Sequence, residues 1–204
     1  GSIPLYWSQD PFSMKPPPLL EGNAEDNKKA FARHFESQLQ YHNKIICINL
    51  AEQHGKEGQI TNAYDDACKQ FSNDKVVYEA FDFHEECKGM KFERVGKLID
   101  EMRESELKQM DCFWKCVKAE KGEKVIYSKQ QGAFRVSCLD CLDRTNVVQS
   151  AFAKHMLSVQ LERLGVHIAN GQSGRDEAFD FAFNDSWANN GDMVSQIYAG
   201  TRAL

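Results

Sequence analysis

A cysteine followed after five residues by an arginine is the feature of this sequence that most constrains its fold. The pair is Cys138 and Arg144, and residues 138–145 lie between a strand-like run and a helix-like run. A loop at such a junction can turn its backbone N–H groups towards a tetrahedral anion, and the following helix adds the partial positive charge of its N-terminus. Residues 138–145 therefore predict a nucleophile loop that binds phosphate.

The residue types in this loop suit phosphoryl transfer. In the mouth of such a loop the pKa of Cys138 would fall from its usual value towards roughly 3.5 to 7.5, which makes it a thiolate at neutral pH. Thiolate attack on phosphorus would give a phosphocysteine and expel an alcohol. The fork of Arg144 can hold two phosphate oxygens, and Thr145 can donate a hydrogen bond to the thiolate. Backbone N–H groups of the other loop residues would contact the phosphate: Leu139, Cys141 and Leu142.

Two aspartates inside an anion-binding loop need a role, because ionised carboxylates would repel phosphate. We expect Asp140 to act as general acid towards the leaving oxygen, with a pKa raised by burial and by the neighbouring dianion. Asp143 precedes Arg144 at the expected helix start, where an Asp side chain can cap free N–H groups.

Residues 134–146 read Phe-Arg-Val-Ser-Cys-Leu-Asp-Cys-Leu-Asp-Arg-Thr-Asn and resemble the signature of the Sac-domain phosphoinositide phosphatases. The family pattern is Arg-x-Asn-Cys-x-Asp-Cys-Leu-Asp-Arg-Thr-Asn, and only Ser137 departs from it, where the family usually has Asn. Other segments resemble the family in the same order along the chain: residues 1–9, 81–84, 187–192 and 198–201.

The resemblance implies a phosphatase that works through a phosphocysteine without metal or cofactor. It implies phosphoinositide lipids at a membrane surface as partners, with phosphatidylinositol 4-phosphate as the leading substrate and Asn146 as a further substrate-binding residue. It also implies a cytoplasmic protein, peripheral to the cytosolic face of the Golgi, the endoplasmic reticulum or endosomes. On this resemblance residues 1–204 form the catalytic portion of a larger Sac domain whose N-terminal half is absent.

Composition fits these expectations. The formal net charge of -5 argues against broad nucleic-acid binding, which usually needs a basic patch. Seven cysteines in a chain of this length, without a disulfide-scaffold pattern, indicate a reducing compartment. No apolar run approaches the roughly 20 residues needed to cross a bilayer.

Hydrophobic periodicity predicts an α/β fold, a mixed and largely parallel sheet flanked by helices with the Cys-x5-Arg loop between a strand and a helix. Residues 1–22 are Pro-rich and expected to be extended. Strands are expected at residues 44–50, 76–83 and 132–137, with a hairpin at residues 112–127. Helices are expected at about residues 23–41, 60–71, 95–102 and 145–164.

Three residues outside the loop are candidates for substrate contact. His84 lies just past an expected strand, so in a parallel sheet it would emerge at the same edge as Cys138. It could contact substrate or support the loop by a hydrogen bond. Lys88 and Lys91 follow it and could engage inositol phosphates or acidic lipid, although such lysines are often only solvated.

Other classes of protein remain open. Zinc could be held by four thiols, those of Cys112, Cys116, Cys138 and Cys141, and a dithiol redox site could use Cys138 and Cys141. Neither leaves a role for Arg144. A third alternative is a catalytically weak phosphoinositide-binding scaffold. The intact set of Cys, Arg and Asp residues argues against it, and we expect Ser137 to change the rate or specificity more than to abolish activity.

Overall fold

The computed structural model describes residues 2–13, 16–89, 93–102, 104–118, 122–139, 142–166 and 174–203. The chain divides into two compact units, Gly1–Leu139 and Asp140–Leu204.

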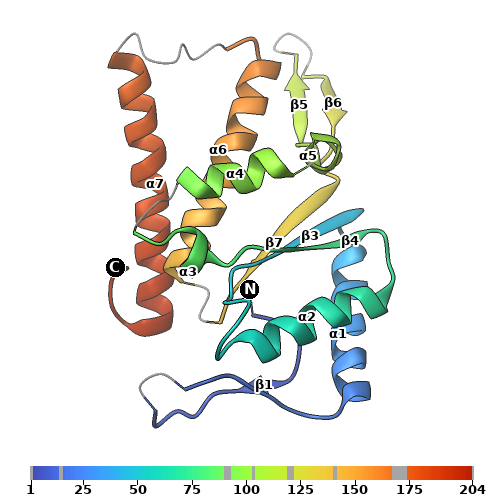
Figure 1. The fold of residues 1–204 in the computed structure, drawn as a ribbon. Coiled ribbons are helices and arrows are strands. Elements are labelled where there is room, and N and C mark those ends of the chain that lie inside the picture. Colours follow the sequence, from blue (N-terminus) through green and yellow to red (C-terminus); the bar gives the residue numbers. More distant parts are fainter. Residues whose placement is uncertain are drawn as a thin grey trace. The chain divides into compact units, whose positions relative to one another are not determined.

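The first unit is built on a three-stranded sheet with the order β4-β3-β7. Strand β3 (Lys44–Asn49) pairs in parallel with both β4 (Val76–Ala80) and β7 (Gly132–Ser137), as Figure 1 shows. Every residue of β3 after Lys44 is buried, as expected for a central parallel strand covered on both faces. The predicted α/β class, with a parallel sheet flanked by helices, is confirmed.

Helices α1 (Ala24–Leu39) and α2 (Gly58–Phe71) cover one face of this sheet. Their buried aromatic residues pack in one cluster with Ile45 and Cys47 of β3, and Phe31 and Phe35 lie with ring centroids 4.5 Å apart. Fully burying side chains of this size contributes about 1.5 to 3 kcal/mol each. The apolar residues expected in these two helices therefore lie on the helix faces that form the core.

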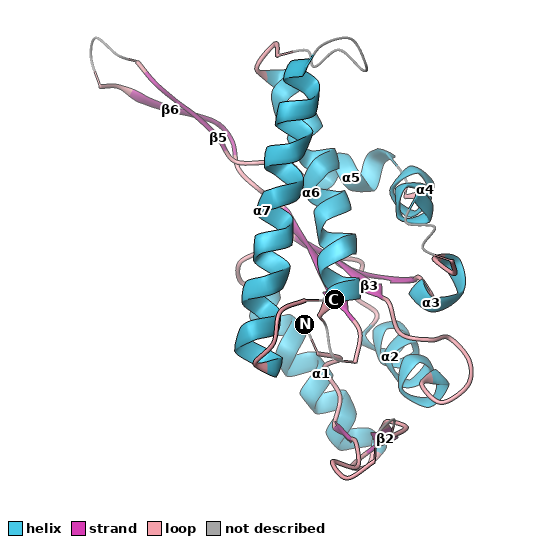
Figure 2. Cartoon of the chain, turned by 90° about the vertical axis from the view of Figure 1, so that its left-hand side faces the viewer, coloured by secondary structure: helices cyan, strands magenta, loops and turns pink. Residues whose placement is uncertain are grey.

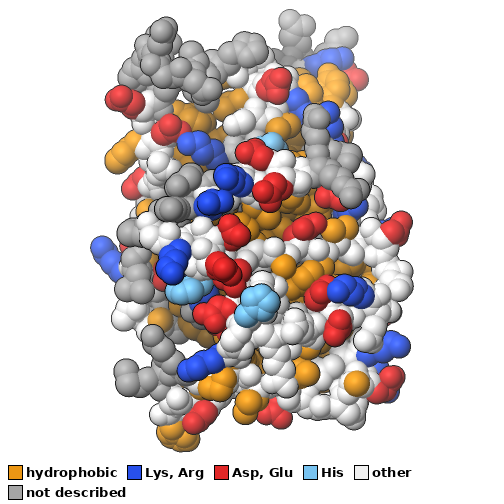
Figure 3. All heavy atoms as spheres, in the orientation of Figure 1, with side chains coloured by type: hydrophobic (Ala, Val, Ile, Leu, Met, Phe, Trp, Pro, Cys, Tyr) orange, Lys and Arg blue, Asp and Glu red, His pale blue; other side chains and the backbone are white. Residues whose placement is uncertain are grey.

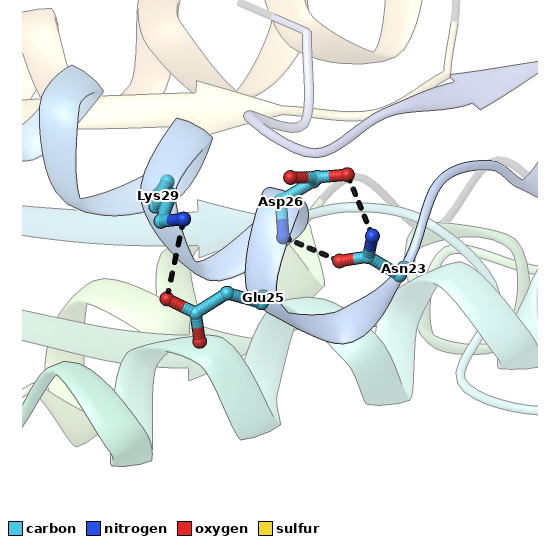
Figure 4. A network of polar contacts seen from close by, with 4 residues as sticks. All are labelled: Asn23, Glu25, Asp26 and Lys29. Carbon is cyan, nitrogen blue, oxygen red and sulfur yellow. Dashed lines mark hydrogen bonds and ion pairs between the residues drawn. The ribbon is translucent and has the colours of Figure 1, made fainter.

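A reciprocal pair of hydrogen bonds fixes the start of α1 (Figure 4). The backbone N–H of Asp26 donates to Oδ1 of Asn23 at 2.8 Å, and Nδ2 of Asn23 donates to Oδ2 of Asp26 at 2.8 Å. Such a cap satisfies N–H groups that the first helical turn leaves free. One turn later Lys29 pairs with Glu25 at 3.6 Å on the exposed face.

The Pro-rich segment forms a short antiparallel pair, β1 (Trp7–Ser8) and β2 (Leu19–Leu20). Trp7 is partly buried and packs against the main core, and its indole N–H donates to the carbonyl of Ile3 at 3.3 Å. The Pro-rich segment is thus attached to the first unit through Trp7 on β1 and Leu20 on β2, which both pack against the core.

Between β4 and β7 the described residues form three short helices and a hairpin. The helices are α3 (Phe83–Glu86), α4 (Glu93–Glu101) and α5 (Glu104–Met110). The hairpin consists of β5 (Trp114–Val117) and β6 (Lys124–Ser128), as predicted. The strand expected at residues 76–83 is shorter than predicted, because Asp82 caps α3 with a hydrogen bond from the Glu85 N–H at 3.0 Å.

The second unit contains two long helices, α6 (Asp143–Arg163) and α7 (Gly174–Ala199), which contact one another (Figure 2). Helix α6 was predicted, and Gly165 follows its end with a left-handed φ of 69° that a glycine adopts without strain. Lys154 of α6 pairs with Asp180 of α7 at 2.9 Å. Within the described ranges, no helix combines the length and the apolar character that crossing a bilayer requires.

Candidate functional site

The carboxyl ends of the three parallel strands lie at one edge of the sheet. Asn49 of β3 is in register with both Ala80 and Ser137. The ladder continues one residue further on each side, where the Leu50 N–H donates to the Ser137 carbonyl at 2.8 Å and the Phe81 N–H to the Asn49 carbonyl at 2.9 Å. In open parallel sheets this edge is where ligands usually bind.

The predicted nucleophile follows this edge directly. Cys138 is the first residue after β7, and both Cys138 and Ser137 are fully buried. Leu139 packs against the core cluster of the first unit. Asp140 and Cys141 lie outside the described residues, so the assignment of Asp140 as general acid stays a prediction.

Arg144 and Thr145 lie in the first turn of α6, where a helix favours anions. Arg144 is half-buried and Thr145 buried. Helix α6 begins at Asp143 itself, and Leu142, whose side chain makes no cap hydrogen bond, occupies the N-cap position. Asp143 is the acidic residue of the first turn, and capping by its side chain stays a prediction.

Asn146 links α6 to α7 through both ends of its amide. Its Nδ2 donates to the Trp187 carbonyl at 3.0 Å, and its Oδ1 accepts from Nδ2 of Asn190 at 2.8 Å. Gly191 makes this contact possible, because a Cβ there would lie 2.9 Å from the Asn146 Nδ2. The family-like segments at residues 134–146 and 187–192 thus meet in the structure, and substrate contact by Asn146 stays a prediction.

An arginine to which the sequence analysis gave no role lies three residues before Cys138. Arg135 of β7 donates from Nε to Nε2 of His34 at 2.9 Å and from a terminal nitrogen to the Tyr64 hydroxyl at 3.4 Å. It also lies over the Phe35 ring, 5.9 Å from the centroid. Burial, and then the charge of Arg135, lower the pKa of His34 below its usual value. The signature showed this arginine, but only the fold shows its partners.

Two buried thiols lie beside this network. Cys47 is in register with Arg135 across the sheet, and its thiol is hydrogen bonded to that of Cys68. The hydrogen bond from Cys68 lowers the pKa of Cys47, and the same contact raises that of Cys68. Both thiols lie in the core cluster of the first unit, so this shift reflects their packing against each other and does not by itself indicate a nucleophile.

Asn49 is another polar residue to which the sequence analysis gave no role, and it is fully buried. Its Nδ2 donates to the Tyr78 hydroxyl at 3.0 Å, and its Oδ1 accepts from the Ala51 N–H at 3.3 Å. Burial raises the pKa of Tyr78 to about 12, so this hydroxyl stays protonated. These bonds hold the end of β3, next to the strand that carries Cys138.

His84 does emerge at the same sheet edge as Cys138, as predicted from the parallel sheet. It lies in α3, and its side chain is exposed. Because β3 separates β4 from β7, the two strands that precede His84 and Cys138 are two strand spacings apart, about 10 Å. Asp82 fixes this segment by accepting from the Gln53 N–H at 2.9 Å. Lys88 is exposed after α3, and Lys91 lies outside the described residues.

A cavity of about 360 Å³ opens beside the carboxyl end of β4. Its ionisable lining is mostly acidic: Glu79, Asp82, Glu86, Glu101 and Glu106, against Arg94 and Lys97. An excess of carboxylates would repel a phosphorylated ligand, so this cavity is a poor candidate for the substrate site. In the face that Figure 3 shows, acidic and basic side chains are interspersed.

The thiols of the alternative zinc site differ in their surroundings. Cys112 is buried, whereas Cys116 is exposed on β5. The described residues contain no group of three or more His, Cys, Asp or Glu side chains that could hold a metal ion, and Cys141 lies outside them.

These findings define a parallel α/β protein in which a Cys-x5-Arg sequence follows a buried strand and leads into a helix. Residues 1–88 match the SacI homology domain. Over its full length the chain is 42% identical to the phosphatidylinositide phosphatase SAC2 of Homo sapiens and 41% identical to that of Mus musculus. It is 37% identical over its full length to the phosphatidylinositol-3-phosphatase SAC1 of Drosophila melanogaster.

The chain belongs to the Sac family of phosphoinositide phosphatase homologues. It spans 17% of the length of the two SAC2 relatives and 34% of that of the SAC1 relative. The signature at residues 134–146 lies beyond the residues that match the domain but within the stretch shared with these relatives.

Proposed function

We propose that this protein hydrolyses a phosphate monoester on the inositol ring of a phosphoinositide lipid, with Cys138 as the nucleophile. The observation that carries the proposal is the place of the signature cysteine. It follows the end of a buried parallel strand, and five residues later the chain begins a helix whose second residue is Arg144. The names of the SAC1 and SAC2 relatives support the same substrate class.

The reaction would proceed in two displacements. The Cys138 thiolate attacks phosphorus, the ester oxygen leaves with a proton from Asp140, and a phosphocysteine forms. Water then attacks the phosphocysteine, Asp140 takes its proton, and inorganic phosphate and the free thiolate are released. Arg144 would hold two of the phosphate oxygens during both steps, and Thr145 would hydrogen bond to the sulfur.

The position of the phosphate on the ring is a finer question. Resemblance to the family makes phosphatidylinositol 4-phosphate the leading substrate, whereas the SAC1 relative of Drosophila melanogaster is named a phosphatidylinositol-3-phosphatase. Nothing in the loop residues separates the ring positions. We therefore take the 4-phosphate as the first substrate to test, with the 3- and 5-phosphates beside it.

Phosphate release from short-chain phosphoinositides, measured with EDTA present, tests this function. The wild-type protein should release phosphate from at least one isomer, and Cys138→Ser should release none. Cys116→Ser is the matched control, because Cys116 is an exposed cysteine on β5, and it should keep wild-type activity. Equal activity of the wild type and Cys138→Ser would overturn the mechanism.

A catalytically weak phosphoinositide-binding protein is the second candidate, and Ser137 is the observation that favours it. Ser137 stands where the family usually has Asn, it is fully buried, and its Oγ has no hydrogen-bond partner among the described residues. Substrate binding by a folded wild-type protein without phosphate release would favour this candidate. Gain of turnover in Ser137→Asn would then identify the missing amide as the cause.

A further inference from the structure

The β5–β6 hairpin bears apolar side chains on its surface that its own unit leaves uncovered. Its residues are far from buried: Phe113 is 59% exposed, Val117 53%, Ile126 51% and Tyr127 60%. Figure 2 shows the hairpin extending away from the strands of the main sheet. A two-stranded hairpin is at best marginally stable in water by itself, so these side chains favour a surface that would cover them.

The register places lysines and aliphatic side chains on the same face of the hairpin. Lys115 lies directly opposite Ile126, and Val117 lies directly opposite Lys124. Directly opposed residues in an antiparallel pair point to the same side. One face therefore carries two exposed lysines beside two exposed aliphatic side chains.

Aromatic residues add apolar surface at the base of the hairpin, where Trp114 lies on the face opposite to Lys115 because neighbouring residues of a strand point to opposite sides. The Trp114 and Tyr127 rings pack with centroids 5.1 Å apart, across a bulge between Trp114 and Lys115. Trp and Tyr are the residues that prefer the boundary between lipid and water, because one end of each ring system is apolar and the other polar.

The charge of the hairpin favours a lipid surface over a protein as the partner that covers it. Residues 112–129 contain five lysines and two glutamates, in a chain whose formal net charge is -5. One pair, Lys118 with Glu123 at 3.0 Å, is satisfied internally. Lysine is depleted at protein–protein interfaces, whereas near an anionic membrane it attracts lipid headgroups while its stem lies along apolar surface.

We propose that the β5–β6 hairpin is a docking surface for an anionic lipid bilayer. The lysines would contact headgroups while Val117 and Ile126, on the same face, enter the boundary with the acyl chains. The inference extends the proposed function, since a phosphoinositide substrate lies in such a bilayer. Docking itself requires neither the substrate nor Cys138.

Co-sedimentation with vesicles that contain no phosphoinositide tests the docking surface separately from catalysis. The full chain should bind vesicles of phosphatidylcholine with added phosphatidylserine and should bind pure phosphatidylcholine much more weakly. The double variant Lys115→Gln, Lys124→Gln should bind the anionic vesicles about 30-fold more weakly, from the attraction typical of a lysine near such a surface. The double variant Val117→Ser, Ile126→Ser should also weaken binding. This loss should remain at high salt, because it removes apolar contact and not charge.

The matched control removes the same charge elsewhere. Lys56 and Lys75 are exposed lysines outside the hairpin, and Lys56→Gln, Lys75→Gln should bind as the wild type does. Equal loss of binding in this control, or wild-type binding that is indifferent to phosphatidylserine, would overturn the proposal. So would gel filtration that shows a dimer which the hairpin variants dissociate, because a second copy would then cover this face.

A readout without membrane separates this inference from the proposed function. Hydrolysis of a short-chain, soluble phosphoinositide should be unchanged in the hairpin variants, which also shows that they fold. If the wild type hydrolyses nothing but still binds anionic vesicles through the hairpin, the proposed function fails and the docking surface stands.

Discussion

Nε of Arg135 donates a hydrogen bond to Nε2 of His34 at 2.9 Å, and this bond joins the strand that precedes Cys138 to helix α1. The acceptor nitrogen must be unprotonated, so His34 is held neutral. The same guanidinium donates to Tyr64 of α2 and lies over the Phe35 ring. Strand β7 is thus tied to both helices that cover one face of the sheet.

The neutral state of His34 predicts a loss of stability in mild acid. Its pKa in the folded protein is lowered by burial and by Arg135, whereas in the unfolded chain it should lie near about 6.5. Between these two values the unfolded state binds more protons. The contribution is complete above about pH 6.5 and is lost as the pH falls towards the folded-state pKa.

Urea unfolding of the wild type and of His34→Gln across this pH range measures the effect. Glutamine can accept the Arg135 hydrogen bond without titrating, so the free energy of unfolding of the wild type should fall relative to that of His34→Gln as the pH falls. His54→Gln, at an exposed histidine, is the control. A difference between wild type and His34→Gln that does not change with pH would contradict this role.

Gly132, the first residue of β7, should not tolerate a side chain. A Cβ there would lie 2.9 Å from the Lys44 carbonyl oxygen and would clash with the buried Met110 side chain. Because the Lys44 oxygen belongs to the backbone of the sheet and cannot move aside easily, Gly132→Ala should destabilise the protein by about 1 to 3 kcal/mol. Thermal unfolding checks this, with Gly96→Ala as control, since a Cβ at Gly96 meets no atom within 4 Å. Similar melting temperatures for Gly132→Ala and the wild type would show that the strand can shift.

Asn146 should stabilise the pairing of α6 with α7. Asn146→Ala removes hydrogen bonds to the Trp187 carbonyl and from Asn190, and should cost about 1 to 3 kcal/mol if these groups are left unsatisfied. Gly191→Ala should act in the same direction by displacing the Asn146 amide. Asn189→Ala, one position from Asn190 and exposed, should change stability by less than about 0.5 kcal/mol. Equal effects of Asn146→Ala and Asn189→Ala on thermal unfolding would contradict the link.

The parallel core was predictable because its sequence pattern is strong. Residues 45–48 are all apolar, and residues 132–137 lead directly to Cys138; both stretches form strands as expected. Residues 81–83 were expected to continue the second strand, but the Asp82 side chain accepts a hydrogen bond from the Glu85 N–H and a helix begins there. Side-chain capping is a local competition that periodicity does not register.

Helix α7 went unpredicted for a different reason. Its apolar residues do not form one buried stripe, since Phe181 is 73% exposed and Ile197 83% exposed. For the site, the signature predicts a nucleophile and a phosphate-binding arginine, while the contacts of Arg135 and Asn49 depend on partners far away in the sequence. Long-range hydrogen bonds of this kind follow from the fold and not from any local pattern.

Trapping the covalent intermediate tests the thiol mechanism most directly. The protein is mixed with a short-chain phosphoinositide that it hydrolyses, quenched within the first turnover in an alkaline denaturant that preserves the phosphorus–sulfur bond, and digested for mass spectrometry at alkaline pH. With the phosphocysteine mechanism we expect one phosphoryl group on the peptide that contains Cys138, and none in Cys138→Ser. Turnover without any phosphorylated Cys138 peptide, or a phosphoryl group on another residue, would contradict it.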